Sequence, residues 1–521
     1  MIRVRHMPTL YGTVGRDARL FTDCTMPLTE ARQTSRARPG RMADMTYTSL
    51  SRRAALAAVG LAIPSAALAQ AQAGPIRFKG WRDQETDAEQ GFFEVPEDRR
   101  DPGSRRIRLS YVRFPSTAAR PGAPIVYLAG GPGGTATGTA TGPRFPIFQA
   151  LREVADVIAF DQRGTGLSNH IPARPPSTGP LPALTRTALT RYFRDEFQAA
   201  WVDWTRAGVA MRGYNTAESA DDIDALRRHL GAEKIDLWGI SYGTHLALSV
   251  LKRHGGRIGR VALASLEGQD QTVKRPARLD AYLTRVDALL DADPVARAAV
   301  PDLPALMRRV HDRLEAAPVG VSVAGPAGPI DLQVGGFALQ LLAGSLIANP
   351  GTLSLLPGAY LAADAGQMDA LAPFLASMAG QLGVSGMPEA MDLASGISAA
   401  RLSLIEAEAR TAVLGDALNF PMPHLLGAVP GVDLGDEFRA PIRIDTPALL
   451  VAGTLDGRTP LEEQAEVAAQ FQNRTQVTVE NAGHNVFESH PEVQNLLVRF
   501  FRGEAVEDSQ LNLPRPVFRM A

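Results

Sequence analysis

Short apolar runs alternate with amphipathic segments along most of the chain after residue 90. Apolar runs that end in turn residues are typical of buried parallel strands. The segments between them have helical spacing, and one begins with Asn215 as an N-cap and ends before Gly231. Alternating strands and helices predict an α/β fold whose mostly parallel sheet carries helices on both faces. The predicted strands are 91–95, 106–114, 124–128, 157–160, 235–238, 261–265, 448–452 and 477–479, and the predicted helices include 215–230, 244–254, 461–471 and 492–501.

The alternation is interrupted between residues 268 and 439. This stretch is rich in predicted helices, and its apolar segments 337–348 and 353–363 are too short to span a bilayer. We predict a helical lid at 268–439, inserted between a first part of the core at 74–267 and a second part at 440–521. The same helices are equally compatible with the core of a second domain. Two Pro- and Gly-rich stretches are predicted to be surface loops: 173–182 and 318–329.

The first seventy residues differ in composition from the rest of the chain. Residues 1–41 are rich in Arg and irregular, and we predict a non-native or disordered extension there. Residues 42–73 have the parts of an export signal, because Ser51-Arg52-Arg53 precedes an apolar run that ends in small residues. The Arg pair resembles a twin-arginine signal, with an amphipathic helix as the alternative. We therefore expect translation to start at Met42 or Met45 and the protein to be exported to the periplasm or the extracellular space.

The composition excludes several classes of protein. A formal net charge of -1 argues against a nucleic-acid partner held by a broad basic surface. Outside the signal, no apolar run reaches the roughly 18 residues that a bilayer span needs, so we expect no stable membrane association after the signal is removed. The single cysteine, Cys24, excludes an internal disulfide and a Cys-rich metal site.

The strongest sign of chemistry is Gly239-Ile240-Ser241-Tyr242-Gly243, which lies between a predicted strand and a predicted helix. In a G-x-S-x-G motif, a sharp turn presents the serine hydroxyl at the end of the strand, and the small residues let neighbouring chains approach. This context predicts the α/β-hydrolase fold with Ser241 as the nucleophile. An epoxide or haloalkane hydrolase would normally have Asp at this position.

A serine hydroxyl needs a base before it attacks a carbonyl carbon. In this fold, an acid and then a histidine follow the serine along the chain, each after a strand. Asp456 follows the predicted strand 448–452, and His484 follows the predicted strand 477–479. We therefore predict a Ser241–Asp456–His484 triad, in which His484 takes the serine proton and Asp456 orients the imidazole.

Three other residues are weaker candidates for the acid and the base. His490 precedes Pro491 and is expected to cap a helix. Asp445 precedes its strand and therefore lies at the opposite edge of the sheet. His245 lies on the helix that follows the nucleophile, where it is expected to pack rather than react.

A glycine-rich turn at 130–134 directly follows the predicted strand 124–128. A turn in this position brings a backbone N–H to the charge that develops on the attacked carbonyl oxygen. Pro132 has no N–H, so we predict Gly131 and Tyr242 as the two donors of an oxyanion hole. Glycine-rich loops also bind phosphates, but this one lacks the Lys-Ser/Thr pair of a P-loop. We expect the reaction to need no metal and no cofactor.

Three segments indicate a particular family more specifically than the serine motif alone does. They are Gly-Gly-Pro-Gly at 130–133, Asp-Gln-Arg-Gly-Thr-Gly-Leu-Ser at 161–168, and Gly-Thr-Leu-Asp-Gly-Arg-Thr-Pro at 453–460. Together with the serine motif, they resemble the prolyl aminopeptidase and tripeptidyl aminopeptidase family of α/β-hydrolases. The resemblance covers about residues 91–502 and is weakest in the lid. It implies a serine peptidase that releases N-terminal residues or short peptides, through an acyl-enzyme, from a peptide with a free N-terminus. The chain departs from the family at Ala129, where His is frequent, and in a lid without cysteines.

Three charged residues extend this resemblance. We expect Arg163 to brace the active-site loops and Asp161 to pair with it. In prolyl aminopeptidases, acids of the lid hold the α-amino group of the substrate. Glu267, just after the predicted strand 261–265, is near enough to the active-site edge for this role, and an ordinary loop carboxylate is the alternative. The same triad also serves esterases and lipase-like hydrolases, and a binding protein with a vestigial site is the third reading.

Overall fold

A ten-stranded sheet runs through the described part of the chain, which in this computed structural model comprises residues 73–174, 181–325 and 328–520. The predicted extension and the predicted export signal lie outside these residues, apart from Ala73. In spatial order the strands are β1 (Gly74–Lys79), β2 (Glu85–Pro96), β3 (Arg106–Phe114), β5 (Val157–Asp161), β4 (Ile125–Leu128), β6 (Ile235–Ile240), β7 (Ile258–Ala264), β10 (Ala448–Gly453), β11 (Arg474–Glu480) and β12 (Ser509–Asn512).

The sheet is antiparallel from β1 to β5 and parallel from β5 to β12. The prediction of an α/β-hydrolase fold with a mostly parallel sheet is confirmed. The edge strands β1 and β12 were not predicted, because both are short, lack a continuous apolar run and are largely exposed. In the parallel part, the carboxyl ends of neighbouring strands meet at one edge, where ligands bind in such sheets.

Alternate residues of the central strands point to opposite faces of the sheet and belong to separate hydrophobic cores. In β4, Val126 and Leu128 belong to the core of one face, whereas Ile125 and Tyr127 belong to the core of the other. Both faces are therefore covered by helices, as the near-continuous apolar runs of these strands predict. The first core includes residues of α4 (Thr216–His229), α5 (Tyr242–His254) and α16 (Leu461–Ala468), and the second includes residues of α1 (Ala136–Ala140), α2 (Phe145–Leu151) and α17 (Pro491–Arg502).

One long helix, α3 (Arg186–Arg206), joins the core of the sheet to that of the lid. Its first half packs in the lid core through Leu189 and Phe193, and its second half packs in the sheet core through Phe197 and Trp204. These buried residues recur at helical spacing, which is a signal that the sequence carries and the prediction missed.

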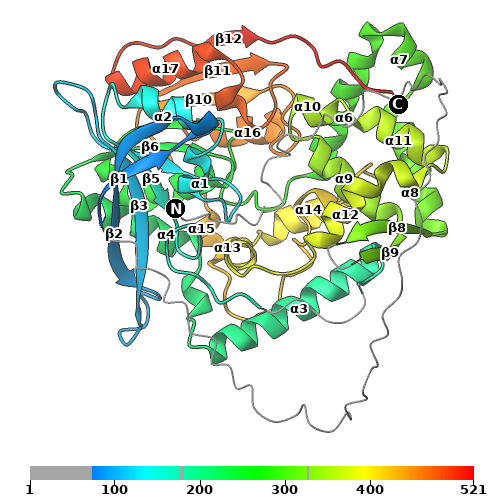
Figure 1. Cartoon of the computed structure of the whole chain (residues 1–521), viewed down its shortest axis with the longest axis horizontal. Coiled ribbons are helices and arrows are strands. Elements are labelled where there is room, and N and C mark those ends of the chain that lie inside the picture. The colour runs from blue at the N-terminus through cyan, green and yellow to red at the C-terminus, as the bar shows by residue number, and fades with distance from the viewer. Residues whose placement is uncertain (1–72, 175–180, 326–327, 521) are drawn as a thin grey trace, which may run out of the picture. The chain divides into compact units, whose positions relative to one another are not determined.

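The lid forms between β7 and β10 and has a hydrophobic core of its own. Figure 1 shows its helices beside a hairpin of β8 (Val319–Gly325) and β9 (Gly328–Val334). The prediction of a surface loop at 318–329 is therefore wrong, because Val321 and Val323 are buried in the lid core, and their alternation is a strand signal that the Gly and Pro residues obscured. No helix of the described ranges is long and apolar enough to cross a membrane. The lid helices are α6 (Pro276–Leu289), α7 (Pro294–Ala299), α8 (Leu303–Ala316), α9 (Gly336–Leu346), α10 (Pro350–Leu353), α11 (Leu356–Asp364), α12 (Ala372–Gly380), α13 (Met387–Ser395), α14 (Ala399–Ala409) and α15 (Gly435–Arg439).

Candidate active site

Ser241 lies at the point where β6 ends and α5 begins. Its backbone has φ 56° and ψ -130°, a strained conformation for a residue with a side chain and one that fits a nucleophile held in a sharp turn. A side chain at Gly243 would collide with the carbonyl group of Leu128, so glycine lets α5 approach the end of β4. The predicted strand, turn and helix are all present, and they hold the serine at the carboxyl edge of the sheet.

Asp456 and His484 are hydrogen-bonded to each other. His484 Nδ1 lies 3.0 Å from both carboxylate oxygens of Asp456. The buried carboxylate also accepts hydrogen bonds from the Thr459 N–H at 2.9 Å and from the Thr459 hydroxyl at 2.6 Å. Burial alone would raise the pKa of Asp456, but the charge of His484 and these hydrogen bonds outweigh burial and lower it. An ionised carboxylate at Nδ1 makes Nε2 the basic nitrogen of His484.

Hydrogen bonds to backbone carbonyls bring the loops of Ser241 and His484 to the same part of the edge. The Ser241 N–H donates to the carbonyl of Ala264 at 3.1 Å, and the hydroxyl of Ser265 donates to the carbonyl of His484 at 2.9 Å. Within the described residues, no hydrogen bond joins the Ser241 hydroxyl to the His484 imidazole. In enzymes without substrate this contact is often long, and it shortens in the complex.

Ala348 and Asn349 of the lid support the histidine loop. The His484 N–H donates to the carbonyl of Ala348 at 2.7 Å. The Asn485 N–H donates to Oδ1 of Asn349 at 3.0 Å. The lid therefore contributes to the position of the predicted base, a role that no sequence motif indicated.

Gly131 lines the same pocket as Ser241. Its φ of +126° lies in the region that favours glycine, and a side chain there would collide with the backbone nitrogens of Gly133 and Gly134. In the part of the chain that the structure describes, neither the Gly131 N–H nor the Tyr242 N–H donates a hydrogen bond to the protein. These two groups stay the predicted donors to an oxyanion.

Asp161 fixes the helix that follows the glycine-rich turn. Its carboxylate accepts hydrogen bonds from the N–H of Thr137 at 3.0 Å and from the Thr137 hydroxyl at 2.6 Å, at the start of α1. It also accepts one from the N–H of Leu167 at 2.8 Å. The predicted ion pair of Asp161 with Arg163 is wrong, because these donors surround the Asp161 carboxylate and the guanidinium of Arg163 reaches other acids.

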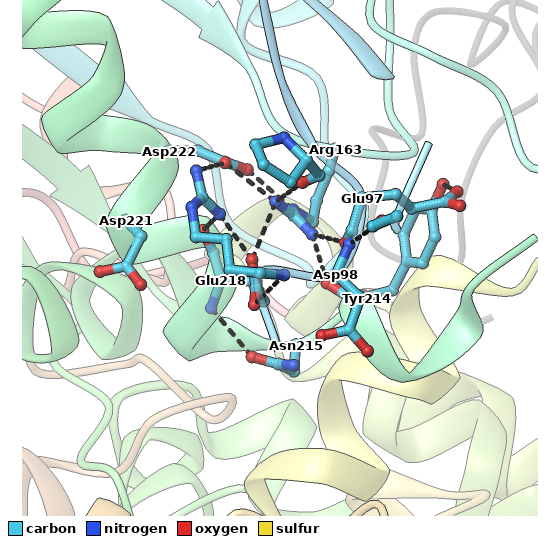
Figure 2. A network of polar contacts seen from close by, with 12 residues as sticks. Glu97, Asp98, Arg163, Tyr214, Asn215, Glu218, Asp221 and Asp222 are labelled. Carbon is cyan, nitrogen blue, oxygen red and sulfur yellow. Dashed lines mark hydrogen bonds and ion pairs between the residues drawn. The ribbon is translucent and has the colours of Figure 1, made fainter. Parts of the chain in front are cut away.

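Arg163 is fully buried and lies at the centre of a network of polar contacts (Figure 2). Its Nε and Nη2 donate to the carboxylate of Asp222, on α4, at 2.7 and 2.9 Å. Its Nη1 donates to the backbone carbonyls of Glu97 at 2.6 Å and Gly213 at 2.5 Å. Arg99 contacts the same Asp222 carboxylate at 2.6 Å. The Arg163 side chain thus joins the loop after β5 to the end of β2 and to α4, which is a bracing role.

A small pocket opens beside Ser241. The Lys274 ammonium lies 2.9 Å from the Glu267 carboxylate, and both side chains are buried. Glu267 lines the same pocket as the predicted nucleophile, and its carboxylate forms an ion pair with Lys274. The pocket is lined by Gly131, Pro132, Ser241, Glu267, Thr272, Lys274, Asp392, Asn419 and Arg458.

Asp392 is a second carboxylate of this pocket and was not predicted. It lies on α13, and within the described ranges its side chain makes no hydrogen bond and no ion pair. Burial raises the pKa of Asp392 well above its usual range; the nearby Glu267 raises it further, and Lys274 opposes the rise. The sequence signal was only one of two acids among the apolar residues of a lid helix, which does not say that the residue faces the nucleophile.

The three weaker candidates do not join this site. His490 caps α17, where its Nδ1 accepts a hydrogen bond from a backbone N–H at 3.0 Å. Asp445 is exposed and pairs with a surface arginine. His245 is buried, and both of its ring nitrogens are hydrogen-bonded to the protein. Among the described residues, no group of three or more His, Cys, Asp or Glu side chains is arranged to hold a metal ion.

Comparisons with known proteins agree with this geometry. A family model described as "alpha/beta hydrolase fold" matches residues 123–335, and one described as "TAP-like protein" matches residues 434–511. A tripeptidyl aminopeptidase of Streptomyces lividans is 30% identical over 176 residues, which are 30% of this chain and 31% of that protein. The serine protease Hip1 of Mycobacterium tuberculosis is 27% identical over 194 residues, which are 33% of this chain and 35% of that protein. The chain thus matches about a third of the length of these curated relatives.

Among solved structures, a proline iminopeptidase of Mycobacterium smegmatis is 16% identical with a TM-score of 0.38, over 79% of this chain and 98% of that one. The two family models match both parts of the core and leave residues 336–433 of the lid unmatched. The sheet order and the serine turn agree with them. The chain therefore has the α/β-hydrolase fold, and it is similar to the tripeptidyl aminopeptidases and other TAP-like proteins.

Proposed function

We propose that this hydrolase is an exported serine aminopeptidase that releases N-terminal residues or short peptides from substrates with a free N-terminus. The observation that carries the proposal is one pocket lined by Ser241 and by two carboxylates, Glu267 and Asp392. A serine nucleophile alone fits any acyl transfer. Carboxylates beside it fit a substrate with a positive charge near the reacting carbonyl, and the α-ammonium group of a peptide is such a charge.

In the proposed reaction, Ser241 Oγ bonds to the carbonyl carbon of the scissile peptide while Nε2 of His484 takes the hydroxyl proton. The buried Asp456 carboxylate holds the ring and stabilises the imidazolium, and the N–H groups of Gly131 and Tyr242 donate to the oxyanion. His484 then gives the proton to the leaving amine as the C–N bond breaks and the acyl-enzyme forms. Water, deprotonated by His484, releases the N-terminal product and restores the serine.

The ammonium site in this proposal consists of Glu267 and Asp392 together. Because Lys274 neutralises much of the charge of Glu267, Asp392 is the carboxylate that meets the substrate cation directly. Burial raises the pKa of Asp392, which means that its negative charge is unfavourable in the empty pocket and that a substrate ammonium would stabilise this charge. Water screens an ion pair in a buried pocket less than one on the surface, so the pair discriminates strongly in favour of a charged amine.

An esterase with the same triad is the second candidate, because the fold does not fix the substrate. It gains nothing from carboxylates beside the nucleophile, and a pocket lined by four charged side chains disfavours a long apolar acyl chain. A binding protein with a vestigial site is disfavoured, because every residue predicted for the triad and the oxyanion hole is present and because His484 is hydrogen-bonded to Asp456.

A substrate panel tests the proposal. It contains aminoacyl and tripeptidyl amides, each with a free and with an acetylated N-terminus, and simple esters. We expect kcat/KM to be at least about 30-fold higher for the free amines, since loss of a charge pair shielded from water costs on the order of 2–4 kcal/mol. Equal activity on free and acetylated peptides would contradict the proposal, and activity on esters alone would favour the esterase. The same panel identifies the length of the released unit.

A further inference from the structure

His245 lies on α5, one turn after Ser241, and is fully buried. Its Nδ1 lies 3.0 Å from the carbonyl oxygen of Gly268, and its Nε2 lies 3.0 Å from the hydroxyl of Ser395. Burial lowers the pKa of His245, so the ring is neutral and has one donor and one acceptor. A carbonyl only accepts, so Nδ1–H donates to Gly268 and Nε2 accepts from the Ser395 hydroxyl.

The Ser395 hydroxyl is one part of a longer buried chain of hydrogen bonds. Since its proton goes to His245, the Thr216 hydroxyl, 3.2 Å away, donates to it. The Tyr242 hydroxyl lies 3.1 Å from the Thr216 hydroxyl and 3.3 Å from the sulfur of Met391. Ser395 and Met391 both belong to α13, so these side chains fasten the second half of that lid helix to the nucleophile helix.

The first half of α13 rests on the loops of the sheet. Pro388 fills the space beside Gly133, where an added Cβ would lie 2.6 Å from it. Met387 fills the space beside Gly164, where an added Cβ would lie 3.1 Å from it. The helix is thus held at both ends, and Asp392 lies between them and lines the pocket.

We propose that His245 is a positioning residue that sets both carboxylates of the pocket relative to Ser241. Through Nδ1 it holds Gly268, the residue that follows Glu267, and through Nε2 it holds Ser395, which is on the helix of Asp392. One ring on the nucleophile helix therefore determines how far the substrate ammonium lies from the reacting carbonyl. This inference rests on the proposed aminopeptidase function.

The physical reason is that one bound position of the substrate must place its ammonium at the carboxylates and its carbonyl at Ser241. A substrate that is held by its ammonium at one end reacts only if its carbonyl reaches Ser241, and a misplacement of about 1 Å can cost about 100-fold in rate. Small esters have no ammonium, so their reaction does not depend on that distance.

The experiment compares variants that each keep one of the two hydrogen bonds of His245. In His245→Gln, the amide oxygen can still accept from Ser395, and in His245→Asn the amide nitrogen can still donate to Gly268. Ser395→Ala removes the lid contact with a smaller change in volume. The control is Ser249→Ala, a buried hydroxyl one turn further along the same helix. The readouts are kcat and KM for a free-amine peptide amide and for a small ester.

We expect His245→Asn and Ser395→Ala to lower the ratio of peptide to ester kcat/KM about 10- to 100-fold, mainly through kcat for the peptide. In His245→Gln the ratio of peptide to ester kcat/KM should return to near the wild-type value. In Ser249→Ala it should be unchanged from the wild type. Equal losses on peptide and ester in the first two variants, or no recovery in His245→Gln, would overturn the positioning role. A wild-type enzyme that treats free and acetylated peptides alike would instead overturn the proposed function.

Discussion

Around Ser241, the pairing of charged side chains decides which carboxylate is open to a substrate cation. Lys274 is paired with Glu267 at 2.9 Å, whereas Asp392 lines the pocket with no ion pair among the described residues. A partly buried carboxylate without an ion-pair partner is stabilised when it meets a ligand cation. This difference between the two carboxylates is the basis of the proposed site for a positively charged group beside the nucleophile.

Removal of any member of the triad should nearly abolish activity. Ser241→Ala, His484→Ala and Asp456→Asn should each lower kcat by on the order of 10⁴-fold or more. The three act as a unit, so a double variant should be little worse than a single one. A serine-directed phosphonate should label the wild type at Ser241, and mass spectrometry of the labelled peptide checks the site. Substantial activity in Ser241→Ala would show that the nucleophile is elsewhere.

Glu267→Gln should affect peptides far more than esters. The change leaves the buried Lys274 ammonium unpaired next to the substrate ammonium, so kcat/KM for free-amine peptides should fall by the equivalent of on the order of 2–4 kcal/mol. Peptide cleavage should also fall as the pH rises through roughly 8, where the α-amine loses its proton. Pre-steady-state and steady-state kinetics on both substrate classes measure this, with Asp445→Asn, an exposed acid, as the control. Equal losses on peptide and ester would make Glu267 a structural residue.

At the scale of elements, the parts that the sequence predicted are those with a local signal. The apolar runs of the central strands and the serine turn were predicted from a few consecutive residues. Asp392 was missed because its role depends on how α13 lies over the nucleophile, and lid packing has no short-range signature. The ion-pair partner of Arg163 was also missed, because Asp222 is distant in sequence and is brought close only by the docking of α4 on the sheet.

Arg163→Met should destabilise the fold strongly. It leaves the buried carboxylates of Asp222 and Glu218 with less compensating charge, and breaking a buried ion pair typically costs about 3–5 kcal/mol. Arg228 is an exposed arginine on α4, the helix that carries Asp222. Its replacement in Arg228→Met should cost less than about 1 kcal/mol. Denaturant unfolding of the two variants checks this, and similar stabilities would mean that the Arg163 network does not brace the fold.

At the scale of the whole molecule, one buried acid far from the pocket makes stability depend on pH. Burial raises the pKa of Asp236 to about 7, and the N–H of Arg260 donates to its carboxylate at 2.7 Å. The folded state therefore holds this proton at pH values where the unfolded state has lost it. From about pH 4 to about pH 7, this residue makes the free energy of unfolding fall as the pH rises.

Asp236→Asn should remove that pH dependence, because the amide cannot ionise and its oxygen still accepts from Arg260. At pH 8 the variant should be more stable than the wild type by on the order of 3–4 kcal/mol, and the difference should shrink toward pH 4. Unfolding curves at several pH values measure the difference. A constant difference across this range would contradict the raised pKa.

Export concerns residues that lie outside the described part of the chain, so it stays a proposal from the sequence. A chain that begins at Met42 should be exported and trimmed after Ala69 or Ala73. Replacing both Arg52 and Arg53 by Lys should leave the precursor in the cytoplasm if the route is twin-arginine. Cell fractionation and N-terminal sequencing check both points. An untrimmed N-terminus on protein from its native source would contradict export, and export of the Lys variant would indicate a general signal peptide.

The central claim is that Asp392 recognises the substrate amine beside Ser241, and one comparison tests it most directly. It measures kcat/KM for the same peptide amide with a free and with an acetylated N-terminus, in the wild type and in Asp392→Asn. The account predicts that the wild type prefers the free amine by at least about 30-fold and that Asp392→Asn loses most of this preference by losing activity on the free amine alone. A preference that persists unchanged in Asp392→Asn, or that is absent from the wild type, would contradict the account.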